Sequence, residues 1–193
     1  MRSLSSLIFL ALVILDDVIR CENMLQLYKK VLNSHNPYVL QTRSYDGKSF
    51  EAKNCSYIFK PQERTTGTTD GMQSLFQCYK ADDGGRACNP LEAKLTGSKG
   101  KKKPEVTIRN MGETGTQGRS YTIQHFNESE DCFLMTFQPC EGHLECELHV
   151  FNTKTAIRTP SCDAAYNEHC EGRTHQTFKP DCSDMFPQEA NSQ

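Results

Sequence analysis

The chain has little net charge, no tryptophan and no long apolar run beyond one near its start. Its 22 Lys and Arg against 24 Asp and Glu give a formal net charge of −2 over 193 residues. Neither the basic footprint of a nucleic-acid-binding protein nor an acidic tail is present. The one basic run, Lys99 to Lys103, lies among Gly, Ser and Pro, and we interpret it as a solvated hairpin loop. We therefore expect no nucleic-acid partner.

Motifs of the common enzyme classes are also missing. No Gly-rich phosphate loop stands between a strand and a helix. His169 and His175, with Cys170 between them, do not have the spacing of zinc ligands. Cys182 lies between acids, but a nucleophilic cysteine needs a free thiol and a positioned base. We expect a protein that is not an enzyme and that uses no metal or cofactor.

The single apolar run indicates a secretory signal peptide. Arg2 supplies a minimal positive region, and the residues from Leu7 to Leu15 form an apolar core of suitable length. The run is too short to span a bilayer, and no later segment approaches the roughly 20 apolar residues of a membrane helix. We assign residues 1–21 to the signal peptide and 22–193 to one secreted domain. Cleavage beside Cys21 decides whether ten or nine cysteines remain.

The cysteine content agrees with an oxidising compartment. Ten cysteines occur in the chain, and they are densest between Cys132 and Cys182. This arrangement is typical of a small extracellular fold stabilised by disulfides. Asn54 and Asn127 both lie in glycosylation sequons, and we expect Asn127 to be modified more readily because its Asn-Glu-Ser-Glu-Asp run is polar.

The pattern of apolar and turn residues predicts an all-β fold with two flanking helices. Residues 23–33 have helical spacing, and Pro160 opens a second helix that runs to about Gly172, followed by an extended tail. Eight strands separated by Gly-rich or polar turns lie between the helices. Such a series favours an antiparallel up-and-down barrel, whose interior at this strand number can hold one small ligand. The expected strands cover residues 37–45, 54–60, 71–80, 87–96, 104–111, 118–127, 132–139 and 145–152.

Hairpin register assigns side chains to the two faces of the last strand pair. A turn at His143 would pair Cys140 with Cys146 and Phe137 with His149. One face then carries Cys132, Leu134, Cys140, Cys146, Leu148 and Val150, and the other carries Phe133, Met135, Phe137, Glu147, His149 and Phe151. A turn at Asp83 similarly places Cys78 opposite Cys88. Both cysteine pairs are candidates for cross-strand bridges.

Several short motifs resemble those of the lipocalins of tick saliva, the group that includes the histamine-binding proteins. The matching segments are Tyr38-Val-Leu, Arg43-Ser-Tyr45, Cys55, Asp131-Cys132, Cys146-Glu-Leu-His149 and the series Cys162, Cys170 and Cys182. By this resemblance Cys55 bonds to Cys182, and Cys132 to Cys162. The remaining pairing is Cys140–Cys146 with Cys21–Cys170. In the alternative, Cys146 joins Cys170, and Cys140 pairs with Cys21 or stays free.

The resemblance implies binding of a biogenic amine, such as histamine or serotonin, inside the barrel. A protonated amine there needs carboxylates and aromatic faces. The chain retains Glu147, but Phe133 stands where amine binders carry an acid and His149 where they carry an aromatic residue. The candidate ligand-binding residues are Glu147, His149, Phe133, Met135, Phe137, Phe151, Tyr45, Phe50 and Tyr121.

Three functions follow from these observations. The protein sequesters a small host inflammatory mediator and thereby blunts host defence at a feeding site, with a biogenic amine as the first expectation. The apolar residues among the candidates make a lipid mediator, an eicosanoid or fatty acid, a close alternative. In the third, the outer surface binds a host plasma protein. We expect a monomer with no membrane association.

Overall fold

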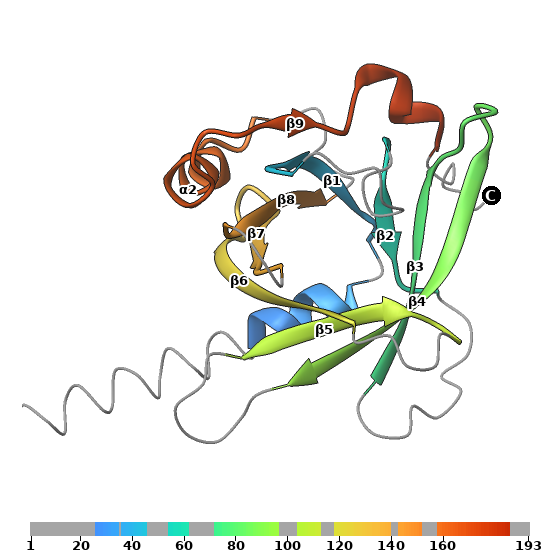
Figure 1. The fold of residues 1–193 in the computed structure, drawn as a ribbon, viewed down its shortest axis with the longest axis horizontal. Helices are drawn as coiled ribbons and strands as arrows, with labels where there is room; N and C mark the ends of the chain where they lie inside the picture. The colour runs from blue at the N-terminus through green and yellow to red at the C-terminus, as the bar shows by residue number, and fades with distance from the viewer. Residues whose placement is uncertain are drawn as a thin grey trace, which may run out of the picture.

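The first eight strands form a closed antiparallel barrel. The computed structural model describes residues 26–34, 36–45, 54–61, 72–96, 104–112, 118–139, 143–151 and 158–185. Within them the sheet order is β2-β3-β4-β5-β6-β7-β8-β1-β9, and an additional β1–β2 pairing closes the ring visible in Figure 1. The strands are β1 (Tyr38–Arg43), β2 (Tyr57–Phe59), β3 (Met72–Lys80), β4 (Arg86–Thr96), β5 (Glu105–Asn110), β6 (Arg119–Asn127), β7 (Cys132–Phe137), β8 (Glu145–Phe151) and β9 (His175–Gln176). The expected eight-stranded barrel is confirmed.

Two helices flank the barrel, as the sequence predicts. The first covers residues 26–33 of the described chain, and its apolar side chains, among them Tyr28 and Val31, join the interior core. The second, α2 (Pro160–His169), begins at a proline, which suits a first helical position. The helix ends at His169, with Cys170 as its C-cap, because Glu171 and Gly172 both adopt positive φ, so it stops short of the expected Gly172. No helix in the described ranges is long and apolar enough to cross a membrane.

The faces of β7 and β8 are as predicted, but the register is not. Phe133 lies opposite His149, and Met135 lies opposite Glu147. The observed pairing differs from the expected one by an even number of residues, so every side chain keeps its face. Helix α2 covers the outer face, where Cys132, Leu134, Cys146, Leu148 and Val150 form a buried cluster with its own residues.

Four disulfides join the described cysteines, and one of them corrects the sequence-based scheme. Cys55–Cys182, Cys132–Cys162 and Cys78–Cys88 are present as expected. The fourth is Cys146–Cys170, so the preferred Cys140–Cys146 and Cys21–Cys170 pairs are wrong and the alternative holds for this bridge. The register explains the error, because it places Thr136 instead of Cys140 opposite Cys146, and the Cys146 side chain lies on the outer face beneath α2. Cys21 and Cys140 themselves lie outside the described residues.

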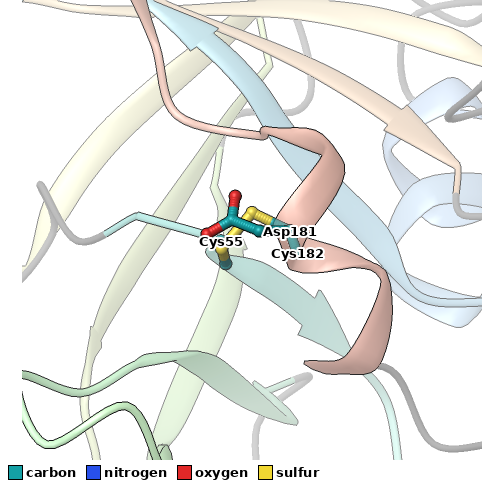
Figure 2. A group of neighbouring side chains, drawn as sticks. All are labelled: Cys55, Asp181 and Cys182. Carbon is teal, nitrogen blue, oxygen red and sulfur yellow. A yellow bond between two sulfur atoms is a disulfide. The ribbon is translucent and has the colours of Figure 1, made fainter.

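The C-terminal segment packs against the barrel where β1 and β2 meet. Strand β2 is shorter than predicted because Asn54 and Cys55 form a turn, with Cys55 at a φ of 54°. Strand β9 pairs with the end of β1 at Thr42 and Arg43, and the Cys55 amide donates to the Thr177 carbonyl. The predicted extended tail closes with the 3-10 helix η4 (Pro180–Met185), which Cys55–Cys182 ties to β2 (Figure 2).

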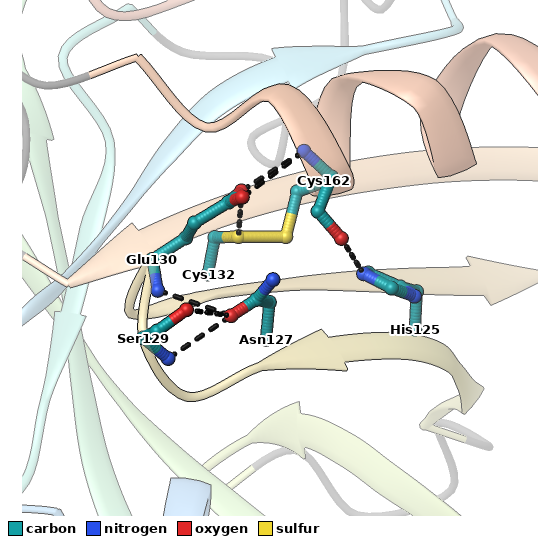
Figure 3. The surroundings of a disulfide bond; sticks show 7 residues. His125, Asn127, Ser129, Glu130, Cys132 and Cys162 are labelled. Carbon is teal, nitrogen blue, oxygen red and sulfur yellow. Dashed lines mark hydrogen bonds between the residues drawn. A yellow bond between two sulfur atoms is a disulfide. The ribbon is translucent and has the colours of Figure 1, made fainter.

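The turn between β6 and β7 anchors the start of α2. Both carboxylate oxygens of Glu130 accept from the Ser161 amide, at 3.2 and 3.0 Å, beside the Cys132–Cys162 bridge (Figure 3). Thr159, the residue preceding the helix, makes no side-chain cap. Glu130 therefore caps the helix from a distant part of the chain, and its negative charge suits the positive end of the helix dipole.

Candidate ligand-binding site

A β-bulge in β1 brings polar side chains onto the inner face of the barrel. Tyr38 pairs with Phe151 and Leu40 with His149, but after a register shift between Leu40 and Thr42, Arg43 pairs with Glu147. Directly paired residues in adjacent strands share a face, so Arg43 faces the same side as Glu147. Without the bulge, the alternation along β1 would turn Arg43 outward.

Glu147 is the centre of a hydrogen-bonded group in this part of the barrel. Its Oε1 accepts from the Tyr45 hydroxyl at 2.6 Å and from the Tyr121 hydroxyl at 3.2 Å. Its Oε2 lies 3.0 Å from His149 Nε2, and Arg119 Nη1 lies 3.8 Å from Oε1. Because an ionised carboxylate only accepts, the imidazole Nε2–H donates. We call Arg43, Tyr45, Arg119, Tyr121, Glu147 and His149 the interior polar cluster.

These contacts keep Glu147 ionised although it is only 5% exposed. Burial acts to raise the pKa of Glu147, but the hydrogen bond and charge of His149, the Tyr45 hydroxyl and the Arg119 guanidinium together lower it below its ordinary value. Burial and the neighbouring Glu147 carboxylate raise the pKa of Tyr45, so its phenol stays protonated and donates. The only carboxylate of the cluster is thus already compensated by the protein itself.

Arg119 extends the cluster across aromatic faces. Its Cζ lies 4.0 Å from the centre of the Phe137 ring, 5.7 Å from that of Tyr45 and 6.0 Å from that of Tyr121. Tyr45 and Tyr121 also contact Phe137 edge-on. A cation over several ring faces is stabilised electrostatically. Any ligand ammonium that used these rings would meet the Arg119 charge.

Two buried side chains of the cluster have nitrogen atoms without a hydrogen-bond partner in the described part of the chain. Arg43 is 6% exposed, and its Nε and Nη1 make no hydrogen bond. His149 Nδ1 is in the same situation. Buried polar atoms are almost always hydrogen-bonded, so unpaired ones mark candidate ligand contacts.

On the same inner face, next to the polar cluster, the predicted ligand-lining residues form a packed aromatic core. Phe133 stacks on His149 with ring centres 5.0 Å apart, and Tyr38 contacts Phe133, His149 and Phe151 edge-on. Met135 and Phe137 belong to the same interior cluster. These residues therefore make the inner face apolar beside the polar cluster.

The structure gathers most of the predicted site residues and adds two that were missed. Glu147, His149, Tyr45 and Tyr121 meet in the polar cluster, whereas Phe50 lies outside the described residues. Arg43 and Arg119 were not predicted. For Arg119 the alternation along β6, which places it on one face with Tyr121, was an available signal, but for Arg43 the bulge concealed it.

In two places an acidic side chain and two cysteines lie close enough together to hold a metal ion, but neither group can bind it through thiolates. The groups are Cys55, Asp181 and Cys182 (Figure 2) and Glu130, Cys132 and Cys162 (Figure 3). In both, the cysteine sulfurs are joined in a disulfide, which leaves no thiolate to bind a metal. The Asp181 carboxylate pairs instead with Lys80 at 2.9 Å.

The two glycosylation acceptors differ in exposure. Asn54 is exposed in the turn before β2, whereas Asn127 is half-buried at the end of β6. The Asn127 Oδ1 accepts from the Ser129 hydroxyl and from the amides of Ser129 and Glu130 (Figure 3). The exposed run therefore begins at Glu128, and modification of either asparagine stays a prediction.

Comparison with solved structures shows the lipocalin architecture. The AM182 serotonin complex has a TM-score of 0.54 at 19% identity, covering 78% of this chain and 88% of that one. Japanin from Rhipicephalus appendiculatus, bound to cholesterol, has a TM-score of 0.54 at 14% identity, covering 77% and 96%. Lobster apocrustacyanin A1 has a TM-score of 0.53 at 8% identity, covering 79% and 82%. At these identities the likeness concerns the fold.

Sequence comparison gives the family. No curated protein matches the chain. The family profile described as tick histamine binding protein, however, matches residues 21–184, nearly the whole of the described chain. With the barrel, the helices and the disulfides in place, this match supports binding of a small ligand, and the chain belongs to the tick histamine-binding protein family.

Proposed function

We propose that the protein is a secreted lipocalin that sequesters a small host mediator inside its barrel. The observation that carries this is the interior polar cluster, a group of charged and aromatic side chains on the inner face of a barrel whose remaining interior is apolar. Small-molecule sites combine an apolar lining with a few placed polar groups in this way. Two fold neighbours are described as bound to serotonin and to cholesterol, which agrees with such a role.

Of the two ligand classes expected from the sequence, the charges favour a lipid mediator. Arg43 and Arg119 oppose one cluster carboxylate, Glu147, which His149 and two tyrosine hydroxyls already engage. A protonated amine would have to displace these partners. An apolar ligand body would instead contact the aromatic residues beside the cluster.

A biogenic amine remains the second candidate because Glu147 is a buried carboxylate beside aromatic rings. Tyr45, Tyr121 and Phe137 surround it, and such rings suit a cation. The departures at Phe133 and His149 predict that an amine binds more weakly than in members with the full acidic set.

Secretion is part of this proposal. Residues 1–21 are proposed as the signal peptide, and four disulfides agree with an oxidising compartment. By analogy with the family, we also propose that the protein binds its ligand without catalysing a reaction and acts as a monomer. Binding of a host plasma protein through the outer surface is the remaining alternative.

Native mass spectrometry of the secreted protein, followed by calorimetric titration with histamine, serotonin and a leukotriene, tests the function. A co-purified lipid, or saturable one-to-one binding of the leukotriene, supports the lead proposal. Binding of only the amines reverses the order of the two classes. If no small molecule binds and the protein captures one plasma protein instead, the sequestration proposal is wrong.

A further inference from the structure

The side chain of Arg43 is a buried cation without a counter-ion in the described part of the chain. It comes from the end of β1, is 6% exposed, and leaves Nε and Nη1 without hydrogen bonds. A guanidinium stays protonated at any ordinary pH, so it cannot relieve its burial by losing a proton. Buried charges in proteins are normally paired, which makes this group incomplete by itself.

The two carboxylates nearest to Arg43 in the register are already engaged elsewhere. Glu147, its direct partner across β1 and β8, binds His149 and Tyr45. Glu145 accepts from Ser44 Oγ at 2.5 Å and lies 3.5 Å from Arg173. Neither carboxylate forms an ion pair with Arg43, although Glu147 lies on the same face of the sheet.

The surroundings of Arg43 suit an anion with an apolar body. Its Cζ lies 5.4 Å from the centre of the Tyr45 ring, and Arg119 lies 5.7 Å from the centre of the same ring. Two guanidinium groups therefore flank one aromatic side chain, and only one carboxylate, Glu147, belongs to the cluster. Farther along the inner face, Phe133 and Phe151 belong to the buried apolar core.

We propose that Arg43 binds the carboxylate of an anionic amphiphile whose hydrocarbon chain enters the barrel. The planar guanidinium presents Nε–H and Nη–H donors in the geometry that a carboxylate accepts in pairs. These are donors of the kind that the free protein leaves unused. This inference rests on the proposed small-molecule function and deepens it, since it names an acidic head group as the ligand chemistry and Arg43 as the residue that recognises it.

A series of twelve-carbon ligands with different head groups tests the proposal. The full secreted protein, freed of co-purified lipid, is titrated calorimetrically with laurate, 1-dodecanol and dodecylamine below their aggregation concentrations. We expect laurate to bind at least about tenfold more tightly than the alcohol or the amine, because charge-assisted pairs are the stronger hydrogen bonds. Equal affinity for acid and alcohol, or preference for the amine, overturns the role of Arg43.

Substitution isolates the residue. Arg43→Gln should weaken laurate binding at least about tenfold and leave 1-dodecanol within about twofold, since only the charged pair is lost. Arg109→Gln is the matched control, because Arg109 pairs with Glu92 on β4 and is exposed. Unchanged laurate binding in Arg43→Gln contradicts the proposal.

A measurement without ligand gives an independent check. Removing an unpaired buried charge should raise the melting temperature of ligand-free Arg43→Gln above that of the wild type. A lower melting temperature would mean that Arg43 is paired within the protein, and would overturn the inference. If none of the three amphiphiles and no amine binds the wild type, it is the proposed function that fails, whereas binding of all three with equal affinity removes only the role of Arg43.

Discussion

Arg43 and Glu147 lie directly opposite each other on β1 and β8, yet the Glu147 carboxylate is held by other partners. Its two oxygens bind Tyr45, Tyr121 and His149, with Arg119 at 3.8 Å. These hydrogen bonds run along β8 to His149, across to Tyr121 on β6 and to Tyr45 just beyond the end of β1, and none of them joins Arg43. Glu147 therefore organises the interior polar cluster, and Arg43 is left to face the interior.

Replacing Glu147 with glutamine should destabilise the protein. The amide cannot offset the charge of Arg119 or accept from His149 and both tyrosines as the carboxylate does. Breaking a buried ion pair by removing one partner costs on the order of 3 kcal/mol. Chemical denaturation of the secreted protein with its disulfides intact measures this loss.

The exposed pair of Glu92 and Arg109 provides the control. Glu92 Oε2 lies 2.7 Å from Arg109 Nη2, but both side chains are partly exposed. Glu92→Gln should cost less than about 1 kcal/mol, because surface ion pairs contribute little. Equal losses in the two variants would show that the interior cluster contributes no more than a surface pair.

The lowered pKa of Glu147 predicts acid sensitivity. The folded protein holds this carboxylate ionised below the ordinary value of 4.5, so between that value and the folded pKa the unfolded chain binds more protons. The contribution of Glu147 is therefore complete above about pH 4.5 and is lost as the pH falls further. The stability difference between wild type and Glu147→Gln should shrink on acidification in a pH series of denaturation curves. A difference that stays constant down to strongly acidic pH contradicts this assignment.

The faces of the strands could be predicted from the sequence more securely than their register. Side chains alternate with a period of two, so any even shift in the β7–β8 pairing leaves Glu147 and His149 inside and Cys146 outside. The position of the turn, by contrast, is not fixed by this alternation, and the expected turn at His143 gave a pairing four residues away from the observed sum of residue numbers. This one error produced the wrong partner for Cys146.

The two β-bulges could not be predicted from the sequence, and they determine which side chains face the interior. Strands β1 and β6 both shift register, between Leu40 and Thr42 and between Ile123 and His125. Each extra residue reverses the alternation that follows it. Arg43 thereby comes to face the interior and His125 the outer face, where it contacts Ser161 of α2 at 2.8 Å.

The disulfide scheme can be checked by peptide mapping under non-reducing conditions. We expect a Cys146–Cys170 peptide and no Cys140–Cys146 peptide. Cys146→Ser should lower the stability by about 2–4 kcal/mol, as is typical for a native bridge. Cys78→Ser serves as a comparison, because its bridge to Cys88 closes a shorter loop and should cost less. Recovery of Cys140 linked to Cys146 would restore the original hairpin register.

Glu130 should be needed for the start of α2. Glu130→Ala removes the acceptor of the Ser161 amide and the negative charge at the helix N-terminus, so we expect a loss of about 1–2 kcal/mol. Hydrogen exchange of the first turn of α2 should quicken, while that of β3 and β4 should not. Glu128→Ala, in the same turn but exposed and paired with Lys30, is the control and should leave α2 unchanged. Equal protection of the Ser161 amide in wild type and Glu130→Ala would refute the cap.

Tyr28 joins the first helix to the bulged strand β6, and we expect its hydroxyl to stabilise the folded protein in addition to its buried ring. The Ile123 amide donates to the Tyr28 hydroxyl at 2.6 Å, directly beside the register shift. Tyr28→Phe leaves that buried amide without an acceptor, which costs about 1–3 kcal/mol, and exchange of the Ile123 amide should accelerate.

Burial raises the pKa of Tyr28 to about 12, so the folded protein keeps the phenolic proton that the unfolded chain loses near 10.0. The wild type should consequently lose stability as the pH rises through this interval, and Tyr28→Phe should lose less. Parallel alkaline denaturation curves for the two proteins would show that this hydroxyl does not titrate with unfolding.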